Sequence, residues 1–322
     1  MTVPDISTVR ELAARYSNWG RFGEDDQLGT LNHVTPEAVV RAAATVRSGR
    51  VVSLGLPLDE HGPQNGGLGR FNPIHLMFRS GVDALAGTTV RDFYHGNDRH
   101  VRGTDDLIIM PLQSSTQWDG LGHMVFDEKI YNGVSADWVS SKGAVKNDIT
   151  AGIDKVVGRG VLLDMPSAMG VESLDPGYPI TADDLRRAER AADLEVGPGD
   201  FVFVRTGHMK ARRVDGGWGD YAGGPAPGLG LEAVPWVAER RIAALATDTW
   251  GFEVQPNETP DTSQPLHIVL LVFMGLWLGE IFALEELLAA CRQEGRHEFL
   301  FVGPPLNIPY AVGSPLAPVA VF

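Results

Sequence analysis

The sequence predicts a mixed α/β domain built on a mixed sheet. Apolar runs of about four to eight residues, typical of buried strands, alternate with a few stretches that begin with helix-capping residues. The alternation covers the whole chain, and no linker, repeat or low-complexity tract divides its 322 residues. We therefore expect one domain over residues 1–322, in which the polar residues 1–34 form an N-terminal arm on the body or on a partner subunit.

Local patterns place the individual elements. Thr35-Pro-Glu predicts a helix start, with a capping Thr, a Pro at the first helical position and an acid in the first turn. Thr181 caps a second helix that runs to residue 193, and residues 231–241 predict a third. The Gly- and Pro-rich residues 215–230 predict a mobile surface loop. Apolar runs predict strands at residues 50–55, 107–112, 161–165, 201–205, 242–248, 299–303 and 318–322. Of these, 107–112, 161–165 and 201–205 are expected to be buried.

Composition excludes several functions. The net charge of −14 argues against nucleic acid and anionic membrane surfaces as partners, because both need a basic face. The sequence contains neither a glycine-rich phosphate loop before a helix nor a Gly-x-Ser-x-Gly elbow, which argues against a nucleotide cofactor and against serine-hydrolase chemistry. Cys291, the single cysteine, cannot form an intramolecular disulfide and is expected to be a packed thiol. The first residues lack a signal-peptide pattern, so we expect a cytoplasmic protein.

Polar side chains follow the apolar run 107–112. Gln113 and Gln117 are four residues apart, Asp119 lies two beyond, and His123 four beyond that. Clustered polar groups just past a buried strand are typical of enzyme sites in α/β proteins. A neighbouring His and Asp can equally form a satisfied structural pair, and the spacing alone does not separate the two interpretations.

This segment resembles a known signature. Its spacing is that of His-x-Gly-Thr-His-x-Asp-x-x-x-His, which is characteristic of the cyclase-like metal-dependent hydrolases that include bacterial kynurenine formamidase and isatin hydrolase. Gln113 and Gln117 stand at the two early His positions, Asp119 at the Asp and His123 at the last His. Other segments resemble the family in the same order along residues 17–322, among them 18–32, 199–207, 246–249, 265–267, 279–280 and 313–320.

The resemblance implies a swivelling β/β/α fold and roles for individual residues. Carried over position by position, His123 is the group that transfers protons, which suits the ordinary pKa of histidine. Asp119, His267 and Glu280 are the candidate metal ligands. The metal of such a site lowers the pKa of bound water and polarises the scissile carbonyl.

The two glutamines depart from the family pattern. A carboxamide oxygen suits zinc less well than imidazole does, whereas manganese tolerates oxygen ligands. We therefore expect at most one divalent ion, Mn²⁺ more readily than Zn²⁺, with Gln113 and Gln117 as weak ligands. In the alternative interpretation the site holds no metal, and the two amides donate hydrogen bonds to a substrate carbonyl. Trp118 either stacks on a flat substrate or belongs to the core.

The function expected from these residues is hydrolysis of a small molecule. Activated water would open a cyclic or simple amide, or a lactone, in a homodimer or higher homo-oligomer. Two alternatives stay open. The first is a cyclase or dehydratase that needs no metal, and the second is a binding protein without catalytic activity on the same scaffold.

Overall fold

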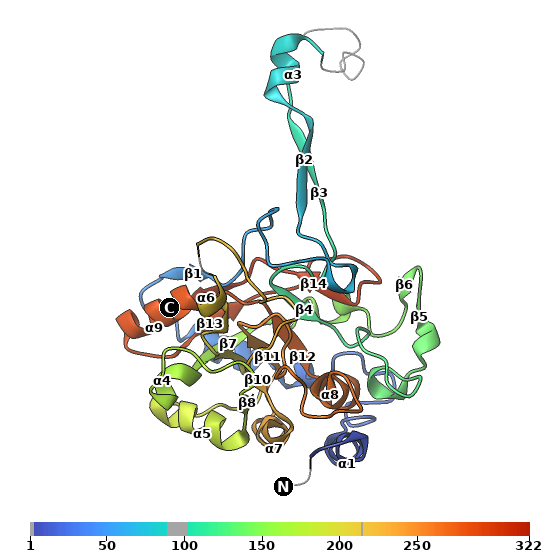
Figure 1. The fold of residues 1–322 in the computed structure, drawn as a ribbon, viewed down its shortest axis with the longest axis vertical. Helices are drawn as coiled ribbons and strands as arrows, with labels where there is room; N and C mark the ends of the chain where they lie inside the picture. Colours follow the sequence, from blue (N-terminus) through green and yellow to red (C-terminus); the bar gives the residue numbers. More distant parts are fainter. Residues whose placement is uncertain (1–2, 89–101, 214) are drawn as a thin grey trace.

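A nine-stranded mixed sheet forms the centre of the computed structural model, which describes residues 3–88, 102–213 and 215–322. Figure 1 shows the sheet in the body of the molecule, with one long hairpin projecting from it. Across the sheet the strands are β1 (Val51–Ser53), β15 (Val319–Val321), β13 (Glu298–Val302), β7 (Val157–Asp164), β9 (Phe201–Arg205), β11 (Ala244–Thr247), β12 (Trp277–Glu280), β4 (Gln117–Asp119) and β14 (Gly313–Pro315).

The four central strands run parallel, and the flanking strands are antiparallel. β7, β9, β11 and β12 pair in parallel, whereas β4 and β14 on one side and β13, β15 and β1 on the other pair antiparallel. Every residue of β9 is buried, as expected for a continuous apolar run at the middle of a sheet. The carboxyl ends of parallel strands are the usual place for polar functional groups.

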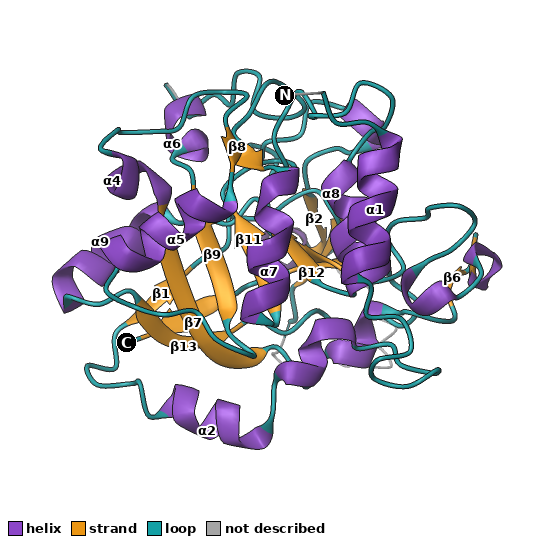
Figure 2. Ribbon diagram, turned by 90° about the horizontal axis from the view of Figure 1, so that it is seen from below, coloured by secondary structure: helices purple, strands orange, loops and turns teal. Residues whose placement is uncertain are grey.

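Helices cover the sheet, and Figure 2 shows α5 and α7 in front of β9 and β11, with α1 beside α7. Thr35 caps α2 as predicted, and Thr181 forms a capping box with Asp184 at the start of α5. The helices are α1 (Ile6–Tyr16), α2 (Pro36–Ala43), α3 (Gly81–Ala86), α4 (Met165–Met169), α5 (Ala182–Ala191), α6 (His208–Arg212), α7 (Val234–Arg240), α8 (Pro265–His267), the π-helix η8 (Ile268–Met274) and α9 (Glu285–Glu294). No helix among the described residues is long and apolar enough to cross a bilayer.

The N-terminal arm packs onto the body of its own chain. The Trp19 ring stacks on Phe273 of η8 at 4.7 Å, and its indole N–H donates to the carbonyl of Val272 at 2.7 Å. Asn18 is buried and donates to the carbonyl of Met274 at 2.8 Å. The arm therefore fixes the π-helix, which begins directly after His267.

The structure corrects the prediction of a buried strand at residues 107–112. β3 (Asp105–Ile109) pairs with β2 (Ile74–Arg79) in the projecting hairpin, and Leu107, Ile108 and Ile109 are 40–48% exposed. An apolar run indicates that its side chains favour burial, but it does not say which surface covers them. Within this chain the body does not cover them.

The predicted surface loop at residues 215–230 is also corrected in part. Tyr221 is 1% exposed and donates to the carbonyl of Asp248, and residues 226–230 are buried. Gly228–Leu229 forms β10, which pairs with β8 (Pro179–Ile180). Residues 215–220 and 223–225 of this segment are exposed or half-buried. Glycine and proline content indicates loop structure, but it does not determine whether a loop is exposed.

Candidate metal centre

The candidate site lies where β12 meets β4. The two strands are antiparallel, and their register places Gln117 directly opposite Glu280. Successive side chains of a strand point to opposite faces, so Gln117 and Asp119 share the face on which Glu280 lies. His267 comes from α8, whose first residue is Pro265. The site thus combines three segments that are far apart in the sequence.

Asp119, His267 and Glu280 converge closely enough to hold one ion. One ligand atom of each lies within 4.8 Å of the other two, and all three side chains are buried. His267 Nε2 is 3.4 Å from Glu280 Oε1. The backbone N–H of Phe252 donates to the same Glu280 oxygen at 3.1 Å. The three candidate ligands predicted from the sequence are therefore brought together.

Burial and close contact shift the pKa values of this cluster. Burial raises the pKa of Asp119, against the opposing effect of the nearby His123 imidazole. Burial disfavours the charged form of His267, but hydrogen bonds to Glu253 and Glu280 outweigh it and raise its pKa to about 10. The site gathers buried carboxylates around a single imidazole, and this arrangement favours a positive charge among them.

Two oxygen atoms of the site support a cation there. Asp119 Oδ2 and Gln117 Oε1 are buried and have no hydrogen-bond partner. Buried acceptors without partners are rare in folded proteins, and a bound ion can satisfy such an oxygen. Two carboxylates and one imidazole form a mixed oxygen and nitrogen donor set, which suits manganese or zinc. The residues present therefore fit one divalent ion.

The side-chain amide of Gln117 joins the two carboxylates. Its nitrogen donates to Glu280 Oε2 at 3.0 Å and lies 3.3 Å from Asp119 Oδ1. In this orientation the amide nitrogen contacts the two carboxylates, and Gln117 Oε1 is left without a hydrogen-bond partner. Gln113 is half-buried, and its amide lies so close to Gly313 that a Cβ at that glycine would come within 2.4 Å of Nε2.

His123 lies at the edge of the cluster. Its side chain is 17% exposed, and Nε2 is 3.8 Å from Asp119 Oδ1. A turn closed by the His123 N–H and the Gly120 carbonyl at 2.9 Å holds it there. An imidazole that is partly open to solvent and close to the ligands can exchange protons with water and with a substrate. The proton-transfer role of His123 stays a prediction.

Trp118 points to the opposite face of β4 and is fully buried. Its indole N–H donates to the carbonyl of Gly303 at 2.9 Å, and the ring packs against Phe282 and Phe301. Trp118 therefore belongs to the core, which is the alternative that the sequence left open. It is removed from the candidate substrate-binding residues.

Comparison with known proteins places the chain in a family. The family described as "Putative cyclase" matches residues 33–254, which is more than half of the chain. The chain belongs to the cyclase family. No protein with a curated description matches it.

Solved structures of other proteins are similar to this chain. One described as a novel cyclase is 38% identical, with a TM-score of 0.85 over 96% of this chain and 99% of that one. Isatin hydrolase A from Labrenzia aggregata is 20% identical, with a TM-score of 0.57 over 84% and 93% of the two chains. A predicted metal-dependent hydrolase from Bacillus stearothermophilus is 17% identical, with a TM-score of 0.53 over 84% and 97%. These structures confirm the predicted swivelling β/β/α fold.

Glu253 is a residue near the candidate ligands that the sequence does not mark. Its carboxylate lies 2.5 Å from His267 Nδ1 and accepts hydrogen bonds from the backbone N–H groups of Leu266 and His267. A carboxylate on the second ring nitrogen of a ligand histidine fixes the ring orientation and leaves the other nitrogen free for a metal. No local motif marks Glu253, because its role depends on a contact with His267, which lies 14 residues further along the chain.

Replacing Glu253 with glutamine is expected to weaken metal binding by about 10–100-fold, the usual effect of losing such a partner. Titration of the metal-free protein with Mn²⁺ would measure the change. Glu189→Gln provides a matched control, because Glu189 is also buried and hydrogen-bonded, to Val196, Trp236 and Arg240 instead. Equal metal affinity in the Glu253→Gln variant and the wild type would show that Glu253 does not support the site.

Trp250 and Arg70 are two further residues near the cluster. Trp250 is half-buried, lies two residues before Phe252 and donates to Gln64 at 3.1 Å. The Arg70 guanidinium lies 5.5 Å from the centre of the Trp250 ring. Burial raises the pKa of Asp119, and the charge of Arg70 is one of the weaker effects that oppose this rise. The Trp250 ring is thus held between Gln64 and Arg70, two residues before the backbone N–H that bonds Glu280.

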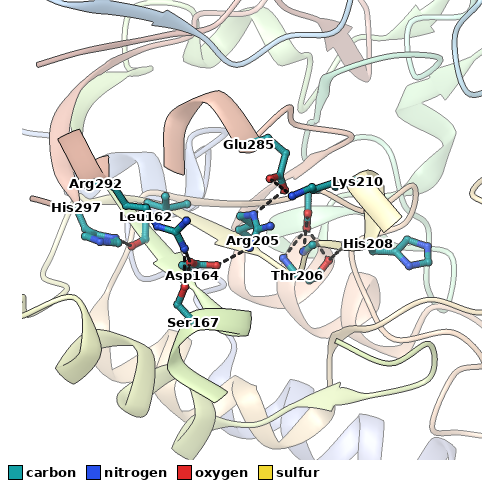
Figure 3. Close-up of polar contacts among 12 residues, drawn as sticks. Leu162, Asp164, Ser167, Arg205, Thr206, His208, Lys210, Glu285, Arg292 and His297 are labelled. Atoms are coloured by element: carbon teal, nitrogen blue, oxygen red, sulfur yellow. Dashed lines mark hydrogen bonds and ion pairs between the residues drawn. The ribbon is translucent and has the colours of Figure 1, made fainter. Parts of the chain in front are cut away.

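A second polar cluster lies at the ends of β7 and β9. Figure 3 shows Arg205 between Asp164 and Glu285, with both contacts at 2.7 Å. Asp248 accepts hydrogen bonds from the backbone N–H groups of Thr206 and Gly207, so it caps the turn after β9. These contacts hold the ends of β7, β9 and β11 together. The cluster is therefore structural.

Proposed function

We propose that this protein is a metal-dependent hydrolase that opens a cyclic or simple amide, or a lactone, of a small molecule. The observation that carries the proposal is the buried convergence of Asp119, His267 and Glu280, with an orphaned carboxylate oxygen on Asp119. The similarity to isatin hydrolases and metal-dependent hydrolases supports the same chemistry. The acidic charge of the chain favours a small-molecule substrate over nucleic acid.

Each residue has a distinct part in this proposal. Asp119, His267 and Glu280 hold one divalent ion, which when bound lowers the pKa of water and polarises the substrate carbonyl. His123 accepts the proton of the attacking water and returns it to the leaving nitrogen or oxygen. Glu253 orients His267, Gln117 holds the two carboxylates in position, and Trp250 offers a flat surface for a planar substrate.

A screen of substrate classes tests the proposal. Lactones, N-formyl amines and cyclic imides would be incubated with the protein in the presence of Mn²⁺, of Zn²⁺ and of a chelator. We expect ring opening or deformylation of at least one class with Mn²⁺, and loss of that activity in chelator. Binding of these compounds without turnover under any condition would point instead to a binding protein on this scaffold.

A cyclase or dehydratase that needs no metal is the second candidate. It is favoured by the Gln117 amide, which joins Asp119 and Glu280, and by His267, which lies between Glu253 and Glu280. These contacts partly offset the negative charge of the carboxylates without a metal ion. In that enzyme His123 would still transfer the proton, and full activity would persist in chelator.

Gln117→His separates the two candidates. If Gln117 stands at a metal-ligand position, the imidazole is expected to tighten metal binding and to shift the preference towards Zn²⁺. If the amide is a donor in a metal-free site, turnover falls and added metal does not restore it. Titration of both proteins with Mn²⁺ and Zn²⁺, followed by activity measurement, distinguishes these results. Gln293→His, on the exposed surface of α9, controls for the added imidazole.

A further inference from the structure

A small cavity opens at the amino ends of β11 and β12. Its volume is about 130 Å³, and its walls include Ile242 and Leu276, which precede these two strands. Glu280 is the last residue of β12, so the cavity lies at the opposite end of that strand from the candidate metal centre. Pockets that take drug-sized ligands have volumes of about 300–1,000 Å³, so this cavity suits a small chemical group.

Three arginines and one histidine from four segments line the cavity. Arg15 lies in the last turn of α1, and Arg21 follows it in the N-terminal arm. His33 ends the 3₁₀-helix η1 (Gly29–His33), and Arg241 comes directly after α7. Figure 2 shows α1 and α7 side by side. The fold therefore gathers side chains that are far apart in the sequence, and we call these four residues the arginine pocket.

The positive charge of the arginine pocket is not balanced by carboxylates. None of the residues that line the cavity is acidic. Within the described part of the chain, no carboxylate forms an ion pair with Arg15, Arg21 or Arg241, and Arg21 donates instead to Asn18 Oδ1 at 2.9 Å. The whole chain has 41 acidic residues against 27 lysines and arginines, so carboxylates are plentiful elsewhere. Like charges around one cavity repel each other, and an anion between them removes this cost.

His33 registers the positive potential of the pocket. Burial lowers the pKa of this half-buried imidazole to about 4, and the nearby charges of Arg21 and Arg241 lower it further in the same direction. The ring packs edge-on against Phe22, with the two ring centres 5.4 Å apart. At neutral pH the imidazole is therefore uncharged, and it carries one N–H that can donate a hydrogen bond.

The helix ends explain only part of this arrangement. Arg15 and Arg241 lie at the carboxyl ends of α1 and α7, where the helix dipole favours a positive charge. Arg21 belongs to no helix, so the dipole does not account for it. Arg241 has a φ of 51°, in the left-handed region where glycine is the usual residue after a helix. The turn itself therefore does not call for an arginine at this position.

We propose that the arginine pocket binds a small oxyanion, either free phosphate or the phosphate group of a small molecule. Guanidinium groups present two N–H donors in a planar fork that matches two oxygens of a phosphate. Three such groups surround a cavity that has room for a small anion, and the neutral imidazole of His33 adds one more donor. The site is separate from the proposed hydrolytic centre, at the other end of β12.

Calorimetric titration of the whole protein with inorganic phosphate, at constant ionic strength set with chloride, tests the proposal. We expect one saturable site per chain with a Kd below about 1 mM. Arg21→Gln and Arg241→Gln should each weaken binding by at least about 10-fold, because each removes charge-assisted hydrogen bonds. Arg187→Gln is the matched control, because it removes the same charge from an exposed position on α5, outside the cavity lining. Its phosphate affinity should equal that of the wild type.

Titration with methyl phosphate distinguishes the two sources of the anion. Tighter binding of inorganic phosphate would assign the free ion, and tighter binding of methyl phosphate would assign a phosphate ester. Proton magnetic resonance places the ligand, because phosphate should shift the ring signal of His33, which is identified by its absence from His33→Gln.

Three results would overturn the inference. They are no saturable phosphate binding at millimolar concentrations, an unchanged affinity in both Arg21→Gln and Arg241→Gln, and an equal loss of affinity in Arg187→Gln. Thermal unfolding of each variant establishes that it is folded. An anion held at the metal centre would bind these variants as it binds the wild type. The test measures phosphate binding and not turnover, so it is independent of the proposed hydrolase activity.

Discussion

Replacing His123 with alanine is expected to reduce kcat by roughly 10²–10⁴-fold while the protein stays folded, the usual contribution of a positioned acid or base. His123 is partly exposed, and its Nε2 lies 3.8 Å from Asp119 Oδ1. Its removal therefore takes the proton acceptor from the edge of the site and leaves the buried ligands in place.

The kcat of His123→Ala and of the wild type would be measured with the substrate found in the screen, at saturating concentrations of substrate and metal. His61→Ala is the matched control, because the His61 side chain is 81% exposed and its closest charged contact is with Glu60. Metal titration of His123→Ala should give the wild-type affinity. If kcat is unchanged in this variant, His123 does not transfer the proton, and the proposed chemistry loses its acid–base group.

Replacing Trp118 with alanine is expected to lower the free energy of unfolding by about 3–5 kcal/mol, the usual cost of truncating a buried tryptophan. The ring is fully buried against Phe282 and Phe301, and its N–H bonds the Gly303 carbonyl. Both the packing and the hydrogen bond are lost in the variant, and a cavity remains between β4 and its neighbours.

Chemical denaturation of the wild type and the variant would measure this change. Trp118→Phe is the control, because it retains an aromatic ring and loses the indole N–H, so a smaller loss of about 1–2 kcal/mol is expected. An unchanged stability of Trp118→Ala, together with a raised KM, would instead show that the ring contacts the substrate.

The sequence predicted the elements whose stability is local or depends on simple burial. The run 201–205 coincides with β9, because a strand buried on both faces needs an unbroken apolar sequence. The capping residues Thr35 and Thr181 placed the starts of α2 and α5, because their hydroxyls bond backbone N–H groups two or three residues on. Such signals do not depend on the rest of the fold.

The sequence did not predict features that depend on tertiary contacts. Residues 107–112 are apolar and were expected to form a buried strand. The local sequence does not determine whether the body of the chain covers these side chains, and β3 lies in the projecting hairpin instead. Asp119, His267 and Glu280 were found through the family resemblance, and the structure shows that they meet. Glu253 was missed because its partner His267 lies on a separate helix.

The metal content and metal dependence of the purified protein test the central claim most directly. We predict at most one ion per chain by elemental analysis, Mn²⁺ bound more readily than Zn²⁺, and hydrolytic activity that a chelator removes and Mn²⁺ restores. The orphaned oxygen of Asp119 beside His267 and Glu280 is the basis of this prediction. Two tightly held zinc ions per chain would contradict the assignment of the ligands. Full activity in chelator with no bound metal would contradict the metal-dependent mechanism itself.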